Sequence, residues 1–328
     1  MNAMLLRTAL VLILSASCFI QPSYAGKLKD YPLDKIAAHT YVIHGPLGLP
    51  SKKNKGFMNN PAFVVTKTGV VVIDPGSTVQ VGRMVLRKIK SVTGKPVTHV
   101  FNTHIHGDHW LGNQAIKEAY PKVSIMAHPL MMQLARGGEG QHWVKTMLSL
   151  TEGESKGTRA VYPDSIMTDN SQVKIGGMRF KIYAPDKAHS FTDLMIHVIE
   201  EDVVFLGDNV LYKRIGRMDD GTFRGNIAAC DVALKINAKH YVPGHGQSGD
   251  KNIVNLYRTY LNTVYSEVRK QMDEGLSDFE MKPLVRAKLK AYHQWVDFDQ
   301  ELGKQVSLAL LEAEKAELEE LSKPKKKE

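Results

Sequence analysis

Short apolar runs rich in β-branched residues alternate with polar, Gly- or Pro-containing segments over residues 41–242. The alternation predicts strands, because β-branched side chains fit a pleated, half-buried surface and Gly or Pro marks the turns between them. The predicted strands are 41–44, 62–66, 70–73, 97–102, 123–127, 173–175, 178–183, 194–199, 203–206 and 240–242.

Segments with helical spacing of apolar residues lie between these strands. The spacing predicts one helix over 81–89, one that ends over 115–119 and one over 228–238. Strands and helices that are mixed along the whole segment indicate an α/β fold rather than an all-β sandwich. We therefore expect residues 26–249 to form one α/β domain.

The pattern becomes helical after Gly249. Gly275 is expected to end a first helix, Pro283 to begin a second, and residues 302–321 to form a long amphipathic third. We expect a helical appendage over 250–322 whose apolar stripe packs on the main domain or on a second subunit, which would make a homo-oligomer. The stripe of the first helix is Leu256, Tyr260, Leu261, Val264, Val268 and Met272.

Residues 1–25 have the pattern of a secretory signal peptide. Arg7 is the only charge among them, an apolar run follows over 9–20, and Ser23 and Ala25 are small residues at the −3 and −1 positions. The run is shorter than the ~20 apolar residues of a membrane span. We expect cleavage after Ala25, a periplasmic mature protein and no integral membrane span in it.

The two cysteines, Cys18 and Cys230, bear on the predicted export in different ways. A lipoprotein signal at Cys18 is the less favoured alternative, because Ser15 stands where such signals prefer Leu. Cleavage after Ala25 would leave Cys230 as the one cysteine, and thus no internal disulfide in an oxidising compartment.

The charge balance excludes one class of partner. The formal net charge is +9, but residues 323–328 supply +3 of it and are expected to form a disordered basic tail. No stretch elsewhere interleaves Arg and Lys with aromatic residues, so we expect no nucleic-acid partner and instead a small-molecule substrate.

The strongest chemical signal is one short segment, residues 103–113, which follows the predicted strand 97–102. Three of the 13 histidines and one aspartate fall within six residues there, at His104, His106, Asp108 and His109. Imidazole nitrogen and carboxylate oxygen are ligands that suit Zn²⁺, and a loop at a strand end can bring them together. The clustering of a scarce residue type argues against a surface turn with histidines by chance.

Further candidate ligands stand after other predicted strands. An Asp after a strand is usually a turn former and a lone His is usually structural, so each is a weak signal alone. They all lie at carboxyl ends of strands, where sites of α/β proteins gather. These candidates are Asp74, His189, Asp208 and His245.

With these residues in this order, the chain closely resembles the metallo-β-lactamase superfamily over about residues 35–250. The family pattern is an early Asp, then His-x-His-x-Asp-His, then His, Asp or Cys, and His. Here it falls on Asp74, His104, His106, Asp108, His109, His189, Asp208 and His245. The resemblance implies a four-layer αββα sandwich with the metals at one edge.

The resemblance also implies a role for each residue. The ligands implied for the first zinc ion are His104, His106 and His189. Those implied for the second are Asp108, His109 and His245. Asp208 would bridge both ions, because a carboxylate has two oxygens, and Asp74 would orient the ligand loop by hydrogen bonds. Seven ligands exceed what one tetrahedral zinc uses, so two ions are expected, with iron or manganese as alternatives to zinc.

Two positions depart from the zinc β-lactamases. They carry Cys or Ser where this chain has Asp208, and the Cys-bearing subclass has a substrate-binding Lys at the position of Leu211. A bridging Asp is similar to the glyoxalase II-like and lactonase-like branches, and His106 argues against the flavo-diiron branch. The signal peptide, residues 56–61 and the helical end are similar to exported members associated with sulfur oxidation or quinoprotein relay.

Together these features predict a zinc-dependent hydrolase. A metal-bound hydroxide would attack an ester, thioester, lactone or amide of a small substrate, with Asp108 or Asp208 orienting the nucleophile. One alternative is a β-lactamase. Another is a non-catalytic metal-binding accessory protein of a periplasmic redox pathway. A nuclease or phosphodiesterase is less favoured, because a basic-aromatic surface and a large inserted domain are missing.

The remaining histidines are expected to lie outside the site. His128 and His142 are the exception, because they flank the Gly-rich residues 136–140, which could reach over it. The histidines expected to be structural or exposed are His39, His44, His99, His197, His240 and His293.

Overall fold

The computed structural model describes residues 28–322. The predicted signal peptide over 1–25, the alternative lipoprotein Cys18 and the basic tail over 323–328 lie outside the described residues. Cys230 is buried and free. Among the described helices, none has both the length and the apolar character that crossing a membrane requires.

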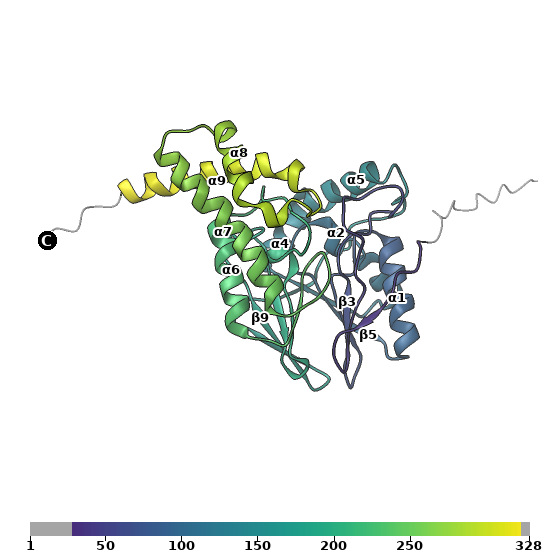
Figure 1. Ribbon diagram of the computed structural model, residues 1–328. Coiled ribbons are helices and arrows are strands. Elements are labelled where there is room, and N and C mark those ends of the chain that lie inside the picture. The colour runs from purple at the N-terminus through teal and green to yellow at the C-terminus, as the bar shows by residue number, and fades with distance from the viewer. Residues whose placement is uncertain (1–27, 323–328) are drawn as a thin grey trace, which may run out of the picture.

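Two sheets form the centre of the molecule (Figure 1). The first sheet has the order β1 (Asp34–Lys35), β2 (Thr40–Val42), β3 (Ala62–Val65), β4 (Val70–Ile73), β5 (Val97–Phe101), β6 (Ser124–Ala127), β7 (Ser165–Ile166). The second has the order β12 (His240–Val242), β11 (Val203–Phe205), β10 (Met195–Val198), β9 (Met178–Tyr183), β8 (Gln172–Ile175). Parallel pairing runs from β4 to β7 and between β11 and β12, so several strands end at the same edge.

The two sheets pack face to face through one apolar cluster. Ala62, Val64 and Val71 from the first sheet meet Ile182 and Ile196 from the second, all with no exposed surface. A central strand such as β4 is buried on both faces, one against this layer and the other against the outer helices. This burial explains why the strands read as nearly continuous apolar runs in the sequence.

Helices cover the outer faces of both sheets (Figure 1). Val81, Val85 and Ile89 of α1 pack on the first sheet, and Ala233 of α6 and Leu261 of α7 pack on the second. The predicted four-layer αββα sandwich is thus confirmed. The helices up to this point of the chain are α1 (Val79–Val92), α2 (Gly107–Trp110), α3 (Asn113–Ala119), α4 (Pro129–Leu134), α5 (Gly140–Leu150), α6 (Phe223–Ile236) and α7 (Lys251–Asp273).

The C-terminal segment is helical, as expected, and consists of α7, α8 (Asp278–Lys288) and α9 (Phe298–Leu321). Its apolar residues join the same cluster as the outer face of the second sheet, so the apolar stripe of α7 packs on the sandwich. Leu256 does not belong to the buried stripe and is 41% exposed. A homo-oligomer through these helices stays a prediction.

The prediction that Pro283 begins a helix is wrong. Helix α8 begins at Asp278, because Ser277 and Glu280 form a capping box that satisfies the first backbone N–H groups. Pro283 lies inside the helix, where it removes one backbone hydrogen bond without ending it.

The Gly-rich residues 136–140 do not form an open loop over the site. Residues 135–139 make a π-helical turn that joins α4 to α5, with Gly138 at φ 132°. His128 accepts a hydrogen bond from Leu130 N at 3.2 Å and so caps α4. The element that reaches the site is α5, which glycine content alone does not predict.

Candidate metal centre

The His-rich segment is held in place by its own buried aromatic residue. Strand β5 ends at Phe101, and the chain then curls into the single helical turn of α2. The indole Nε1 of Trp110, a fully buried residue, donates to Ile105 O at 2.7 Å, which closes the loop on itself. A Cβ at Gly107 would lie 2.6 Å from Trp143 Cβ, so only glycine lets α5 approach this loop so closely.

Seven side chains converge into two groups of metal-ligand type, each with its ligand atoms within 4.8 Å of one another. All of them except His106 are less than a tenth exposed. They come from the His-rich loop and from the ends of strands far apart in the sequence. The first group is His104, His106, His189 and Asp208, and the second is Asp108, His109 and His245.

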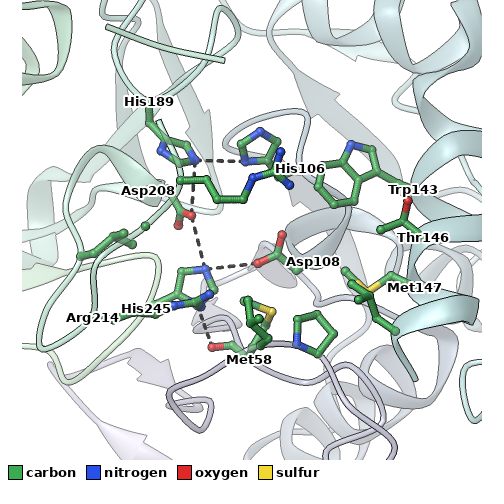
Figure 2. A pocket seen from close by; sticks show the side chains of 16 residues that line it. Met58, His106, Asp108, Trp143, Thr146, Met147, His189, Asp208, Arg214 and His245 are labelled. Carbon is green, nitrogen blue, oxygen red and sulfur yellow. Dashed lines mark hydrogen bonds and ion pairs between the residues drawn. The ribbon is translucent and has the colours of Figure 1, made fainter. Parts of the chain in front are cut away.

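Asp208 lies between the two groups (Figure 2). Its Oδ2 is 3.5 Å from His189 Nε2 in the first group and 3.3 Å from His245 Nε2 in the second. Its Oδ1 is 3.1 Å from His109 Nε2. One carboxylate therefore contacts both sets of imidazoles, which is the placement that a shared ligand requires.

In two of the imidazoles, hydrogen bonds to one ring nitrogen leave the other nitrogen for a metal. Thr103 Oγ1 donates its proton to Asp74, so it must accept from His104 Nδ1 at 3.0 Å, and His104 Nε2 faces the group. His245 Nδ1 donates to Met58 O at 2.8 Å, which leaves its Nε2 in the same way. Such outer hydrogen bonds are the usual means of orienting metal-binding histidines.

Unsatisfied buried atoms test whether metal ions fit here. His104 Nε2, His109 Nε2 and Asp208 Oδ1 are buried and make no well-aligned hydrogen bond, although the last two lie 3.1 Å apart. Buried polar atoms are normally satisfied, since leaving them without a partner costs free energy. Three such atoms that converge on one space, all of ligand type, fit a pair of metal ions. The two His/Asp groups are consistent with a dinuclear site.

Two imidazoles of the first group, those of His104 and His189, resist protonation. Burial, followed by the neighbouring His109 and His106, lowers the pKa of His104 well below its usual value. Burial lowers the pKa of His189 to about 3, despite the nearby Asp208. Neutral imidazole is the form that binds metal, so these ligands are available without losing a proton.

In the second group, the pKa of each histidine is raised instead of lowered. Burial alone would lower the pKa of His109, but the carboxylates of Asp208, Asp108 and Asp74 raise it well above its usual value. The pKa of His245 is also raised against burial, chiefly by Asp208 and by a hydrogen bond with Asp108. In the absence of metal, protons thus occupy the positions that a cation would take.

Asp74 lies behind the His-rich loop and holds it. Its Oδ1 accepts from Thr103 N at 2.8 Å, and its Oδ2 accepts from Thr103 Oγ1 at 2.6 Å and from His109 Nδ1 at 2.8 Å. The backbone of Asp74 has a φ of 48°, a conformation that is uncommon outside glycine. These contacts are of the kind that the sequence predicts for Asp74, while the ligand roles of the other seven residues stay predictions.

Sequence reasoning missed Asp220, which positions His106. Its Oδ2 accepts from His106 Nε2 at 2.9 Å, so His106 turns its Nδ1 toward His189 Nε2 at 3.0 Å. The need of each ligand histidine for an outer partner indicates that such a carboxylate exists. It does not indicate which one, because Asp220 stands in a turn and looks like a turn former.

Gly244 was also missed as a site residue. A Cβ at this position would collide with Asp208 Oδ1. The carboxylate between the two groups therefore lies directly against the backbone before His245, and the Pro-Gly-His-Gly sequence of residues 243–246 carries the only signal of that closeness.

A cavity opens onto the donor groups. Figure 2 shows Trp143, Thr146 and Met147 of α5 on the side that faces Asp108. Its mostly apolar wall with a few polar groups is usual for small-molecule sites. The remaining wall residues include Leu49, Pro50, Leu150, Leu211, Arg214 and Arg217.

An adjoining cavity shares His106, Trp143, Thr146 and Arg217 with the first. His142 lines it, so this histidine is near the site as the sequence suggested, although it is on a helix. The histidines expected outside the site belong to neither donor group. His44, for example, contacts Asp34 Oδ2 at 2.8 Å.

Solved structures with related folds have low sequence identity to this chain but align over most of it. A metallo-β-lactamase from Pontibacter korlensis is 22% identical, with a TM-score of 0.56 over 70% of this chain and 98% of its own. A metallo-β-lactamase from Hirschia baltica is 17% identical, with a TM-score of 0.54 over 71% and 98%. At such identities the likeness shows the fold alone.

The structure of a sec-alkyl sulfatase, PisA1, aligns over more of the chain. It is 15% identical, with a TM-score of 0.66 over 86% of this chain and 50% of its own. Residues 1–249 make up less of the chain than that, so the alignment must include part of the C-terminal helices. No curated protein sequence matches. The sequence pattern of the metallo-β-lactamase superfamily matches residues 55–245, more than half of the chain, which therefore belongs to that superfamily.

Proposed function

We propose that the protein is a dinuclear zinc hydrolase that acts on an ester, thioester, lactone or amide of a small substrate. The observation that carries this proposal is the position of Asp208, whose two oxygens contact imidazoles of both donor groups. A site that held one structural metal would need neither a shared carboxylate nor a cavity open to a substrate.

The donor set favours zinc. Five imidazoles and two carboxylates are the nitrogen and oxygen ligands that zinc accepts, with iron and manganese as alternatives. When bound, the ions would supply Lewis acidity and activated water. His104, His106 and His189 would hold one ion, and the remaining ligands the other, with Asp208 shared.

The residues around the ions would orient the attacking water and bind the substrate. Asp108 and Asp208 present carboxylate oxygens to the shared space, where they can orient an attacking water by accepting its hydrogen bonds. The apolar wall of Trp143 and Met147 would exclude bulk water and bind the apolar part of a substrate.

The test combines metal analysis with turnover. Purified protein in excess zinc should bind two equivalents and hydrolyse at least one member of a panel of esters, thioesters, lactones, amides and β-lactams. A chelator should abolish the turnover and zinc should restore it. One equivalent or fewer of bound metal would contradict the dinuclear site, and two equivalents without turnover would favour the non-catalytic accessory protein.

β-Lactam hydrolysis is the alternative within the hydrolase class. Asp208 and Leu211 stand where the Cys-bearing β-lactamases have a ligand thiolate and a substrate-binding Lys. The panel therefore separates the two, and preferential β-lactam turnover would replace the proposal.

Location and assembly complete the proposal. The pattern of residues 1–25 supports export to the periplasm, and mass spectrometry of the mature protein should find Gly26 at its N-terminus.

Helix α9 exposes Leu311 and Leu318 at 62% and 68%, which supports a homo-oligomer through the C-terminal helices. Sedimentation at increasing concentration tests this assembly, and a monomer throughout would reject it.

A further inference from the structure

A buried arginine lines the cavity beside the second donor group. Arg214 has a side chain that is only 8% exposed, and its Nη1 lies 3.3 Å from His245 Nδ1. That His245 nitrogen already donates its proton to Met58 O, so it offers the guanidinium no acceptor. The contact is a close approach of two donors and needs a separate explanation.

Burial of this cation is only partly compensated. Arg214 Nε donates to Asp297 Oδ2 at 3.1 Å, the one ion pair that the described residues give it. A guanidinium has five N–H donors, and burying a charge is costly unless it is paired and hydrogen-bonded. Metal ions nearby would increase the repulsion. An anion in the cavity would supply both the missing charge and the missing acceptors.

The carboxylate of Asp297 pairs with Arg214 and does not cap α9. Asp297 is the N-cap residue of α9, yet its side chain makes no capping hydrogen bond and its φ is 66°. A capping bond and an ordinary backbone conformation would each stabilise the fold. Asp297 has neither, and its carboxylate pairs with Arg214 instead of capping the helix.

The backbone fixes the loop that carries Arg214 from two sides. Ile215 N donates to Val296 O at 2.9 Å and Val296 N donates to Lys213 O at 3.0 Å, which ties the loop to the C-terminal segment. Tyr212 N donates to His245 O at 3.1 Å, which ties it to the metal-site loop. The guanidinium is therefore held at a set distance from the donor groups.

We propose that Arg214 binds an anionic group of the substrate and that Asp297 of the C-terminal segment positions it. The inference rests on the proposed hydrolase and names its substrate class: an ester with an apolar body and one carboxylate or sulfate. Leu49, Trp143 and Met147 of the cavity wall suit the apolar body. Arg217 is the weaker candidate, since its side chain is 57% exposed and pairs with Asp219 at 2.7 Å.

The first experiment compares two nitrophenyl esters of equal acyl length. In one the acyl chain ends in a carboxylate, and in the other it ends in a carboxamide. In Arg214→Gln, KM for the anionic ester should rise about 10- to 100-fold, as expected for a lost charged hydrogen bond, with little change in kcat. KM for the neutral ester should rise much less than KM for the anionic ester, since the neutral ester lacks the anion.

Asp297→Asn tests the positioning role. It keeps Arg214 but weakens its orientation, so KM for the anionic ester should rise about tenfold or less, and KM for the neutral ester should rise by a smaller factor. Asp297→Glu should recover part of the loss. The matched control is Arg286→Gln, which breaks an Arg–Asp pair to Asp299 in the same C-terminal segment, outside the cavity lining. The control should leave both esters unaffected.

Calorimetry with hexanoate, hexyl sulfate and hexanamide gives a readout independent of turnover. Wild type should bind at least one of the two anions more tightly than hexanamide, with and without zinc, and Arg214→Gln should lose that preference. The preferred anion separates carboxylate from sulfate. Arg214→Lys should retain part of the preference, because it keeps the charge without the planar donor fork.

The outcomes separate the inference from the proposed function. If zinc-loaded wild type hydrolyses neither ester, the proposed hydrolase loses support, while anion binding that depends on Arg214 still supports this inference. If Arg214→Gln affects both esters equally, or wild type prefers neither anion to hexanamide, the inference is overturned. If Arg214→Gln loses its metal, Asp297→Asn decides: a selective loss with the anionic ester supports the inference, and none rejects it.

Discussion

The floor and the wall of the cavity are built in different ways. The floor consists of the donor groups, four of whose residues come from one segment of the sequence between His104 and His109. The wall consists of side chains from α5, the loop after β11 and residues near Leu49, and Asp297 supports it from the start of α9. The floor is polar and fixed by hydrogen bonds, whereas the wall is largely apolar.

This difference teaches where chemistry and selectivity lie in the molecule. Metal ligands need particular atoms at fixed positions, so their residue types leave a pattern that can be read locally. Apolar walls need only volume and shape, which many residues can provide. Substitutions in the floor should therefore change the metal and the rate, and substitutions in the wall should change KM and substrate preference.

The largest effect is expected at the centre of the floor. Asp208→Ala removes the contact between both groups and should reduce turnover by more than about a hundredfold, with loss of one or both metals. Folding should persist, because β11 ends before this residue and its core contacts remain. Metal analysis and circular dichroism check both points. Normal metal content with normal turnover would show that Asp208 is not a metal ligand.

A smaller effect is expected behind the floor. Asp74→Asn keeps the size of the side chain but weakens its bonds to Thr103 and His109, and should lower metal affinity by about 10- to 100-fold. Competition with a chelating dye measures the affinity. Added zinc should restore turnover in Asp74→Asn, in contrast to Asp208→Ala, and failure of rescue would mean that Asp74 acts in the reaction itself.

Lowering the pH should release metal from the second donor group before it releases metal from the first. The pKa of His109 and that of His245 are raised, so below these values a proton occupies each metal-binding nitrogen and must leave on binding. Affinity at the second group should thus fall first as the pH falls. The first group, where the pKa of His189 is about 3, should keep its metal further into acid. Zinc titrations at decreasing pH should show two equivalents becoming one, and simultaneous loss of both would contradict this order.

The smallest effect is expected in the wall. Met147→Ala enlarges the cavity beside Trp143 and should raise KM for an apolar substrate by about tenfold, with unchanged metal content. Leu148→Ala is the control on the same helix, since Leu148 is 42% exposed and does not line the cavity. An equal change in both variants would indicate a general effect on α5 rather than a substrate contact.

The sequence by itself determined the layers of the fold and the composition of the floor. Apolar runs such as β4 are buried on both faces, so their pattern is unambiguous, and the helical spacing of α7 follows from the one face that it buries. The order of Asp74, the His-rich loop, His189, Asp208 and His245 identified the superfamily, because metal chemistry tolerates few substitutions.

Only the tertiary structure decided how the site is completed. Asp220 reaches His106 from 114 positions away in the sequence, and Asp297 reaches Arg214 across 83. Neither carboxylate differs in sequence from an ordinary turn former or helix cap. Their roles depend on loop paths that local propensity does not encode, because long-range packing, not the residue's own preference, sets which side chain meets which.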